Sequence, residues 1–281
     1  MKGCLTPPIG LIAGSGTFPL LLARERARRG QRVVAVAHEG ETLPELKNDV
    51  AEMVWIRLGA LSPLIAFFKE RQVTEVIMAG GIRKTRLFEM RPDARCAALL
   101  SHLTEKSDDM LLRAVADALS REGFSVVAAT EGRSDLLAPE GEMTRPLTEA
   151  EQRDVRWGWQ LAKSIGALDI GQCVVVREGI LLAVEAIEGT DAAIRRGGEL
   201  SGGQAVVIKV CKPGQDTRFD LPTVGADTIA TMKAAGACVL AVEAGMTLMF
   251  DRADLLAQAH AAEIAVVGIT EPALKNVSWR R

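Results

Sequence analysis

The chain has 281 residues, of which 48% are hydrophobic and 25% charged, so it is long enough for two globular domains with apolar cores. Its 34 basic and 36 acidic residues give a net charge of −2, which argues against a nucleic-acid-binding protein. Its apolar runs are far shorter than the roughly 18 residues that a membrane span needs. The first residues, MKGCLTPPIGLIAGSG, are typical of a strand and not of a signal peptide.

The cysteines and histidines do not form a recognisable metal site. The five cysteines are scattered and never occur as CxxC, which favours reduced thiols in the cytoplasm over a disulfide framework. The histidines lack the spacing of zinc ligands. We therefore expect surface or core positions for the three histidines, which are His38, His102 and His260.

The first half of the chain alternates short apolar runs with helical patterns. Strands are predicted at 9–13, 32–37, 53–58, 75–79 and 124–128. Helices are predicted at 18–29, 62–69 and 108–122, the last two capped by Ser62 and Ser107. This alternation predicts an α/β fold whose N-terminal Rossmann-like domain, residues 1–130, has a parallel sheet covered on both faces.

The second half begins after a segment rich in Gly, Pro and charge, residues 131–148, which we interpret as a linker. Thr148 and Glu151 have capping-box spacing and predict a helix that runs to about Ile165. Strands are then predicted at 173–178, 180–188, 205–210, 238–243, 247–251 and 264–268, and helices at 190–198, 227–235 and 253–260. The pattern predicts a C-terminal mixed α/β domain over residues 149–281.

Two glycine loops follow predicted strands, and each is a possible ligand site. AGSGTFP at 13–19 opens a helix, and AGGIRK at 79–84 has two cations beside its glycines. A helix N-terminus with close backbone access favours phosphate. However, Pro19 stands where the third glycine of GxGxxG belongs, and a tight strand-to-helix turn is the alternative reading. The candidate binding residues in these loops are Gly14, Ser15, Gly16, Gly80 and Gly81.

The segment VEAIEGTDAAI, residues 184–194, gathers carboxylates where a strand ends. A Glu185 side chain inside an apolar strand needs a partner. Thr190 and Asp191 also suit the start of a helix, where Thr190 would cap and Asp191 would complement the dipole, and this alternative stays open. Candidate site residues here are Glu188, Thr190 and Asp191.

The connector KVCKPGQDTRFDLPTVGADTI, residues 209–229, is unusually rich in charge and rigid turns for a strand-to-helix connection. Its cations could hold phosphate, and its carboxylates could bind a divalent metal or activate water. Mg²⁺ suits such an oxygen-rich setting better than zinc does. A solvated charged loop is the alternative. Candidate residues of the connector are Lys209, Lys212, Asp216, Arg218, Asp220 and Thr223.

Several motifs in this order resemble one known family. They are GLIAGSGTFP, IMAGGI, DDMLLRAVADALSREGF, EAIEGTDAAIRRGG, KVCKPGQDTRFDLPTVGADT and LAVEAGMTL, which together span residues 10 to 248. The chain resembles the LpxI family, the UDP-2,3-diacylglucosamine hydrolases of lipid A synthesis in Gram-negative bacteria. The resemblance covers nearly the whole chain, from Gly10 to about Gly268.

The resemblance implies a reaction, a cofactor and a site. Similar proteins use Mg²⁺ to split the pyrophosphate of UDP-2,3-diacylglucosamine into UMP and 2,3-diacylglucosamine 1-phosphate, called lipid X. Their substrate binds in a cleft between the two domains. The aspartate of the RFDLPT motif, here Asp220, is implied as catalytic, and the metal ligands are expected among Asp220, Asp216 and Asp191. The loop at 14–16 would face the uridine diphosphate.

The amphipathic substrate implies a cytoplasmic protein that touches the inner face of the inner membrane transiently, without a stable anchor. Self-association into a homo-oligomer stays open. Two other classes also stay open: a nicotinamide-dependent oxidoreductase that uses the N-terminal domain, and a non-catalytic protein that binds a UDP-sugar lipid.

Overall fold

The computed structural model of the protein describes residues 7–83, 86, 89–103, 108–131 and 133–276. This part of the chain divides into two compact units. The first comprises residues 1–131 together with Asp216–Asp220, and the second comprises 132–215 and 221–281. The segment 216–220 therefore belongs to the first unit, although the residues on both sides of it in the sequence belong to the second.

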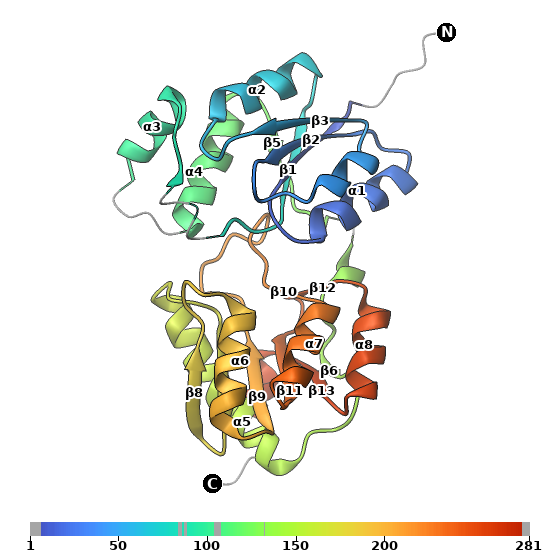
Figure 1. The fold of residues 1–281 in the computed structure, drawn as a ribbon, viewed down its shortest axis with the longest axis vertical. Coiled ribbons are helices and arrows are strands. Elements are labelled where there is room, and N and C mark those ends of the chain that lie inside the picture. Colours follow the sequence, from blue (N-terminus) through green and yellow to red (C-terminus); the bar gives the residue numbers. More distant parts are fainter. Residues whose placement is uncertain (1–6, 84–85, 87–88, 104–107, 132, 277–281) are drawn as a thin grey trace. The chain divides into compact units, whose positions relative to one another are not determined.

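The first unit is built on a parallel sheet of strand order β3-β2-β1-β4-β5 (Figure 1). This is the order of a Rossmann-type half, in which ligands bind beyond the carboxyl ends of the strands. The strands are β1 Ile9–Ala13, β2 Val33–His38, β3 Glu52–Ile56, β4 Glu75–Ala79 and β5 Ser125–Val126. The helices are α1 Phe18–Arg28, α2 Leu61–Glu70, α3 Ala94–Ser101 and α4 Asp108–Arg121, with a 3-10 turn η1 at Pro44–Asn48.

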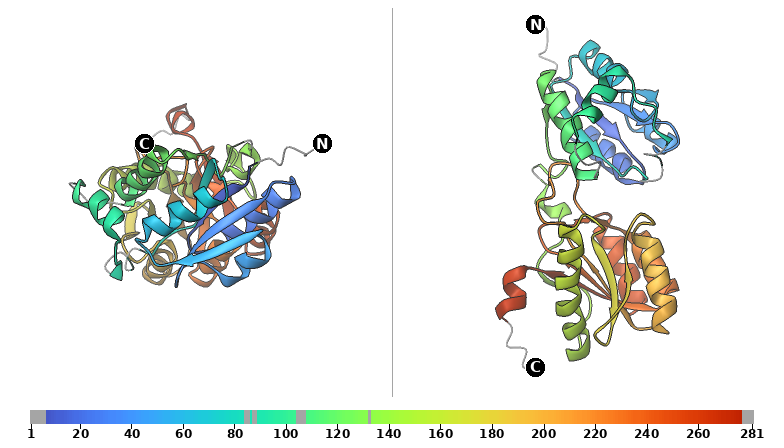
Figure 2. Two further views of the ribbon diagram at one scale, coloured as in Figure 1. Left: turned by 90° about the horizontal axis from the view of Figure 1, so that it is seen from above. Right: turned by 90° about the vertical axis from the view of Figure 1, so that its left-hand side faces the viewer.

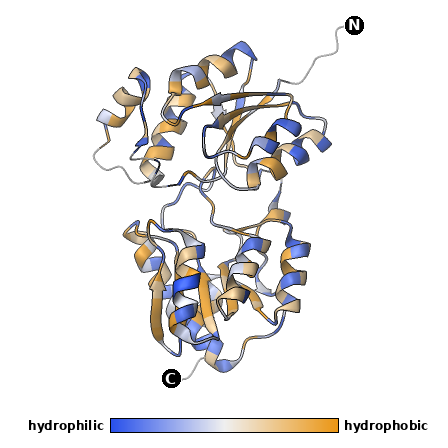
Figure 3. Ribbon diagram, in the orientation of Figure 1, coloured by the Kyte–Doolittle hydropathy of each residue, from blue (hydrophilic) through white to orange (hydrophobic). Residues whose placement is uncertain are grey.

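Alternate residues of each buried strand face opposite layers of helices. In β1, Ile12 packs with α2 and α4, whereas Leu11 packs with α1 and η1. Because both faces are covered, the central strands β1, β2 and β4 are mostly apolar, and Figure 3 shows hydrophobic colouring along much of the sheet. A fully buried leucine or phenylalanine such as Phe68 contributes roughly 2–3 kcal/mol by leaving water.

The second unit contains a mixed sheet of order β6-β13-β11-β9-β7-β8. Strands β9, β11 and β13 are parallel, and β7, β8 and β6 run antiparallel to their neighbours. The strands are β6 Gly141–Glu142, β7 Cys173–Arg177, β8 Ile180–Val184, β9 Ala205–Lys209, β11 Ala237–Glu243 and β13 Ala265–Ile269. A separate short pair joins β10 Thr223–Val224 to β12 Leu248–Met249.

Helices cover both faces of this second sheet as well. The helices are α5 Glu149–Ala167, α6 Thr190–Ser201, α7 Ala226–Ala234, α8 Arg252–Ala261 and α9 Glu271–Asn276, with a 3-10 turn η3 at Ser134–Leu136. Trp159 of α5 packs on one face with Ile208, and Ile194 of α6 packs on the other with Val207. Figure 2 shows α5 and α6 on opposite sides of the sheet. The predicted α/β class, with a Rossmann-like first domain and a mixed second one, is confirmed.

Local predictions differ from the structure where a distant residue intervenes. Helix α2 begins at Leu61, and its N-cap is Ala60, which provides no side-chain cap. The prediction that Ser62 caps this helix is therefore wrong. Instead, Asp93 accepts the Ser62 N–H at 2.7 Å and the Cys96 N–H at 2.8 Å, and so serves two helices. The predicted cap at Ser107 lies outside the described residues. The capping box of Thr148 and Glu151 is confirmed at the start of α5.

The segment predicted as a linker contributes to the second unit. Residues Gly141–Glu142 form β6, which pairs with β13, and Ala138 is buried in the core beside the sheet. Apolar burial and strand pairing explain why this Gly- and Pro-rich segment packs on the second unit.

The two glycine loops of the first unit pack backbone against backbone. The Ser15 N–H donates to the Gly81 carbonyl at 2.6 Å, and the Gly14 N–H donates to the Ala79 carbonyl at 2.8 Å. A Cβ on Gly80 would lie 2.5 Å from the Ser15 carbonyl oxygen, and Gly80 also has a φ of +86°. Close approach of the two loops therefore requires glycine at this position.

We expect Gly80→Ala to destabilise the protein more than Gly16→Ala. Both glycines have positive φ, at +86° and +84°, so both substitutions carry a left-handed penalty of about 1–2 kcal/mol. No atom lies within 4 Å of a Cβ on Gly16, whereas the clash at Gly80 adds about 1–3 kcal/mol. Urea unfolding of both variants measures the difference, and equal losses would contradict this account of the loop contact.

Candidate functional site

The connector between β9 and α7 is held at both ends by side chains of the second unit. At its start, the Glu243 carboxylate accepts the Cys211 N–H at 2.8 Å and the Lys163 ammonium at 2.6 Å. The same ammonium donates to the Cys211 carbonyl at 2.8 Å. One ion pair thus satisfies both backbone groups of Cys211 and fixes where the connector begins.

A second lysine joins the two ends of the connector. Lys209 is only 7% exposed, and its ammonium donates to the Thr223 carbonyl at 2.9 Å. Lys212, predicted with Lys209 to bind phosphate, pairs with Asp169 at 2.7 Å. Since a buried ammonium needs a partner, these contacts give both lysines a structural role. Their contact with a substrate, like that of Thr223, stays a prediction.

The middle of the connector forms a tight turn in the first unit. Arg218 makes a bidentate ion pair with Asp216, with Nε to Oδ1 at 3.0 Å and Nη2 to Oδ2 at 2.7 Å. This guanidinium holds the pKa of the Asp216 carboxyl below its usual range. The Asp216 carbonyl accepts the N–H groups of Phe219 and Asp220 at 3.3 and 3.1 Å. The pair therefore stabilises the turn that presents Asp220.

Asp220 lies on the wall of an apolar pocket of about 290 Å³ in the first unit. The pocket occupies the carboxyl ends of the parallel strands, where α/β proteins bind ligands. Its apolar lining comes from Ile12, Ile56, Leu58, Leu61, Leu64, Met78, Ile82, Met90, Leu99, Leu100, Leu111, Leu112, Val115 and Phe219. Among the described residues, its ionisable lining groups are Asp220, His38 and the Cys96 thiol.

Three of the predicted loop glycines also line this pocket, namely Gly14, Gly80 and Gly81. Ser15, beside them, donates its hydroxyl to the Gly81 carbonyl at 2.9 Å and so reinforces the contact between the loops. The glycines thus bring together two strand ends and leave room at the pocket wall. The alternative reading of a tight turn explains their backbone geometry, and a role in ligand binding is compatible with it.

The carboxylates of the EAIEGTD segment lie in the second unit. Glu185, 8% exposed, accepts the Thr190 hydroxyl at 2.7 Å and the Gln172 N–H at 3.2 Å. The alternative in which Thr190 caps α6 is wrong, because Gly189 is the N-cap and Thr190 turns to Glu185. Glu188 pairs with Arg196 at 2.6 Å. These bonds explain how a carboxylate is tolerated at the end of an apolar strand.

The predicted metal ligands are divided between the units: Asp216 and Asp220 in the first, Asp191 in the second. No group of three His, Cys, Asp or Glu side chains arranged for a metal occurs within the described ranges. Both oxygens of Asp216 contact Arg218, whereas Asp220 lines the apolar pocket of the first unit.

Family models match nearly the whole chain. The model of the LpxI N-terminal domain matches residues 8–136, and that of the LpxI C-terminal domain matches residues 139–267. The chain belongs to the LpxI family. The UDP-2,3-diacylglucosamine pyrophosphatase LpxI of Caulobacter vibrioides is 34% identical over 273 residues, covering 93% of this chain and 97% of that protein. Its name agrees with the hydrolase class that the sequence predicts for this LpxI chain.

Similarity to solved structures is weak. The structure of gox2253 covers 98% of this LpxI chain and 93% of its own at 11% identity, with a TM-score of 0.30. A biotin carboxylase domain of a single-chain bacterial carboxylase covers 59% and 35% at 15% identity, with a TM-score of 0.28. Neither informs function. No helix in the described parts of this LpxI chain has both the length and the apolarity needed to cross a bilayer.

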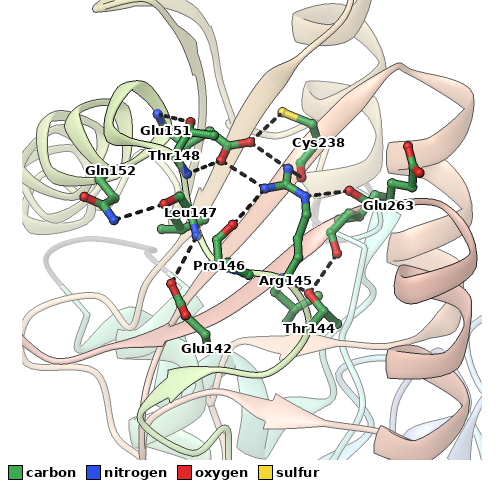
Figure 4. Close-up of polar contacts among 12 residues, drawn as sticks. Glu142, Thr144, Arg145, Pro146, Leu147, Thr148, Glu151, Gln152, Cys238 and Glu263 are labelled. Carbon is green, nitrogen blue, oxygen red and sulfur yellow. Dashed lines mark hydrogen bonds and ion pairs between the residues drawn. The ribbon is translucent and has the colours of Figure 1, made fainter.

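A larger cavity of about 860 Å³ lies in the second unit of this LpxI protein, lined by the amino ends of β9 and β11. Two of its charged lining residues, Arg145 and Glu151, are engaged in internal contacts (Figure 4). Arg145 contacts both oxygens of Glu151 at 2.6 and 3.0 Å and donates to the carbonyls of Cys238 and Glu263. Size therefore does not identify the site. The smaller pocket contains the predicted catalytic residue Asp220, and it lies at the carboxyl ends of the strands of its sheet.

We expect Arg145→Met to destabilise this LpxI protein by about 2 kcal/mol near neutral pH, because half-buried Glu151 loses its charged partner. Burial opposes ionisation of Glu151, but Arg145 and the Thr148 N–H outweigh it and hold the pKa of Glu151 below its ordinary value. The stabilisation is complete above the unfolded-state pKa of about 4.3 and is lost as the pH falls through the folded-state pKa.

Urea unfolding at about pH 7 and about pH 3.5 measures this effect, and the gap between parent and Arg145→Met should narrow in acid. The exposed Arg153 of the same helix provides the control, since Arg153→Met should leave stability nearly unchanged. A gap that stays constant with pH would rule out the ion pair as its source.

Proposed function

We propose that this protein hydrolyses the diphosphate bond of UDP-2,3-diacylglucosamine, giving UMP and 2,3-diacylglucosamine 1-phosphate in lipid A biosynthesis. The observation that carries the proposal is the place of Asp220 on the wall of an apolar pocket that glycines of the two loops also line. Family membership and the activity for which the Caulobacter relative is named support the same reaction.

The pocket lining is suited to an acyl chain of such a substrate. Its walls come from leucine, isoleucine, methionine and phenylalanine side chains, whereas a nucleotide would need many more polar partners. We therefore assign an acyl chain to this pocket in place of the uridine diphosphate end expected at the glycine loops. The polar part of the substrate is proposed to contact the other predicted binding residues, which are Glu188, Thr190, Lys209, Lys212, Arg218 and Thr223.

Asp220 is proposed to orient or deprotonate the attacking water, or to hold Mg²⁺. The Asp216–Arg218 pair fixes the turn before it, so the carboxylate is positioned before substrate binds. When bound, Mg²⁺ would offset the charge that develops on the diphosphate oxygens. The protein is further proposed to act in the cytoplasm at the inner membrane face, where it meets its amphipathic substrate.

We expect Asp220→Asn to lower Mg²⁺-dependent release of UMP from UDP-2,3-diacylglucosamine by about 100-fold or more, since this variant keeps the side-chain size and loses the charge. EDTA should abolish release by the parent protein. Asp227→Asn, at an exposed carboxylate in the first turn of α7, is the matched control and should retain activity. Full activity in Asp220→Asn would remove Asp220 from its role, and a folded parent that releases no UMP would contradict the proposed reaction.

We expect Leu111→Gln to raise KM for the long-chain substrate by about tenfold, or about 1.4 kcal/mol, because a polar group would enter the apolar wall. A water-soluble analogue with two-carbon acyl groups should be hydrolysed equally by variant and parent. Leu200→Gln, on the exposed surface of α6, should change neither substrate's kinetics. An equal effect on both chain lengths would argue that Leu111 does not contact the acyl chain.

A further inference from the structure

One polar side chain in the apolar pocket has no place in the mechanism above. His38, at the end of β2, is 7% exposed and lines the same pocket as Asp220. Its Nδ1 lies 3.0 Å from the Ala13 carbonyl oxygen. A carbonyl only accepts hydrogen bonds, so Nδ1 must carry the ring proton. This contact therefore determines the tautomer and leaves Nε2 without a proton when the ring is neutral.

The ring is held rigidly in this state. The Thr42 hydroxyl donates to the same Ala13 carbonyl at 2.6 Å, and the His38 N–H donates to the Thr42 oxygen at 2.9 Å. Thr42 is itself buried, at 6% exposure. A flip of the imidazole would break the bond from Nδ1 to the Ala13 carbonyl, whose position is shared with Thr42 and the His38 backbone.

The surroundings keep the ring neutral. Burial lowers the pKa of His38, and the bond to Ala13 and the charge of Glu41 only partly oppose this effect. The Glu41 charge is shared with two guanidinium groups, with Arg83 at 3.0 Å and Arg86 at 3.4 Å. Near neutral pH, Nε2 is therefore a hydrogen-bond acceptor and not a donor.

This acceptor has no partner among the residues that the structure describes. His38 lines a pocket whose walls are mainly hydrocarbon, so a ligand that shields Nε2 from water without bonding to it would cost about 1–3 kcal/mol. A ligand that fills the pocket with only a hydrocarbon chain would displace water from Nε2 and would offer no hydrogen-bond donor in its place. A ligand with an N–H or O–H group at the base of its chain would satisfy both the walls and the nitrogen.

We propose that His38 Nε2 accepts a hydrogen bond from the amide N–H that an acylated amino sugar carries at the base of its acyl chain. This inference rests on the acyl-chain assignment of the proposed function and extends it to a residue that positions the ligand. An imidazolium would donate and would select a carbonyl, so the fixed neutral tautomer determines which group is recognised. The pocket therefore discriminates an amide-linked chain from an ester-linked one.

Two substitutions separate the two nitrogens of the ring. His38→Asn places an amide nitrogen near the position of Nδ1, so it can keep the bond to Ala13 but offers nothing at Nε2. His38→Gln reaches the position of Nε2 and can offer its amide oxygen there. Thr42→Val is the control for stability, because it removes support from the ring and leaves Nε2 as an acceptor.

The test is calorimetric binding of two probes that the enzyme cannot hydrolyse, 2-N-dodecanoylglucosamine 1-phosphate and its 2-O-dodecanoylglucose counterpart. The parent should bind the amide probe more tightly. His38→Asn should weaken amide binding about tenfold and leave ester binding within about twofold, and His38→Gln should restore part of the loss.

The possible outcomes separate this inference from the reaction. Equal loss of both probes in His38→Asn, matched by Thr42→Val at a similar melting temperature, would mean a structural role and overturn the inference. Unchanged binding in His38→Asn would overturn it and leave the acyl pocket intact. If the folded parent bound neither probe, both the inference and the acyl-chain assignment would fail, and UMP release would still test the reaction.

Discussion

The bond from the buried Lys209 ammonium to the Thr223 carbonyl holds together the two ends of the segment that carries Asp220. The second unit fixes these ends, and the residues between them, 216–220, pack in the first unit. This closure adds to the contacts of Cys211 with Glu243 and Lys163 and to the pairing of Thr223 with Leu248, so the segment that carries Asp220 has a defined start and end. The candidate site thus depends on a cation that contacts backbone and lies inside the protein.

Other charged side chains of the motif segments also make internal contacts. Arg218 pairs with Asp216, Glu243 accepts the Cys211 N–H and pairs with Lys163, and Glu185 accepts the Thr190 hydroxyl. Charged groups that leave water need partners, so each of these contacts gives a motif residue a role in folding before ligand binding is considered. The pocket offered to a ligand has mainly hydrocarbon walls, and the ionisable groups in its described lining are Asp220, His38 and the Cys96 thiol.

The sequence predicts what depends on local order. Apolar strands, their alternation with helices and the capping box at Thr148 follow from residue spacing, and the structure confirms them. The sequence does not predict contacts made across long separations. Asp93 replaces Ser62 as the partner of the α2 N-terminus from 31 residues away, and Lys163 reaches Glu243 across 80. Helix α3 was missed because its eight residues are too few to show a helical period.

The candidate site was predicted in part. The motifs pointed to Asp220 and to the glycine loops, which the structure brings to one pocket. They could not show that the pocket is apolar, because lining leucines and core leucines have the same pattern in sequence. They also gave no reason to select His38, since its role depends on a tautomer fixed by the Ala13 carbonyl, 25 residues away.

The most direct measurement is photo-crosslinking of the inactive Asp220→Asn protein with UDP-2,3-diacylglucosamine that carries a diazirine at the end of its acyl chain. The account predicts labelled peptides from the pocket lining of the first unit, at residues 56–64, 96–100 and 111–115. Unlabelled long-chain substrate should compete for this labelling. Labelling confined to residues 149–281 would contradict the assignment of the acyl chain to the first unit.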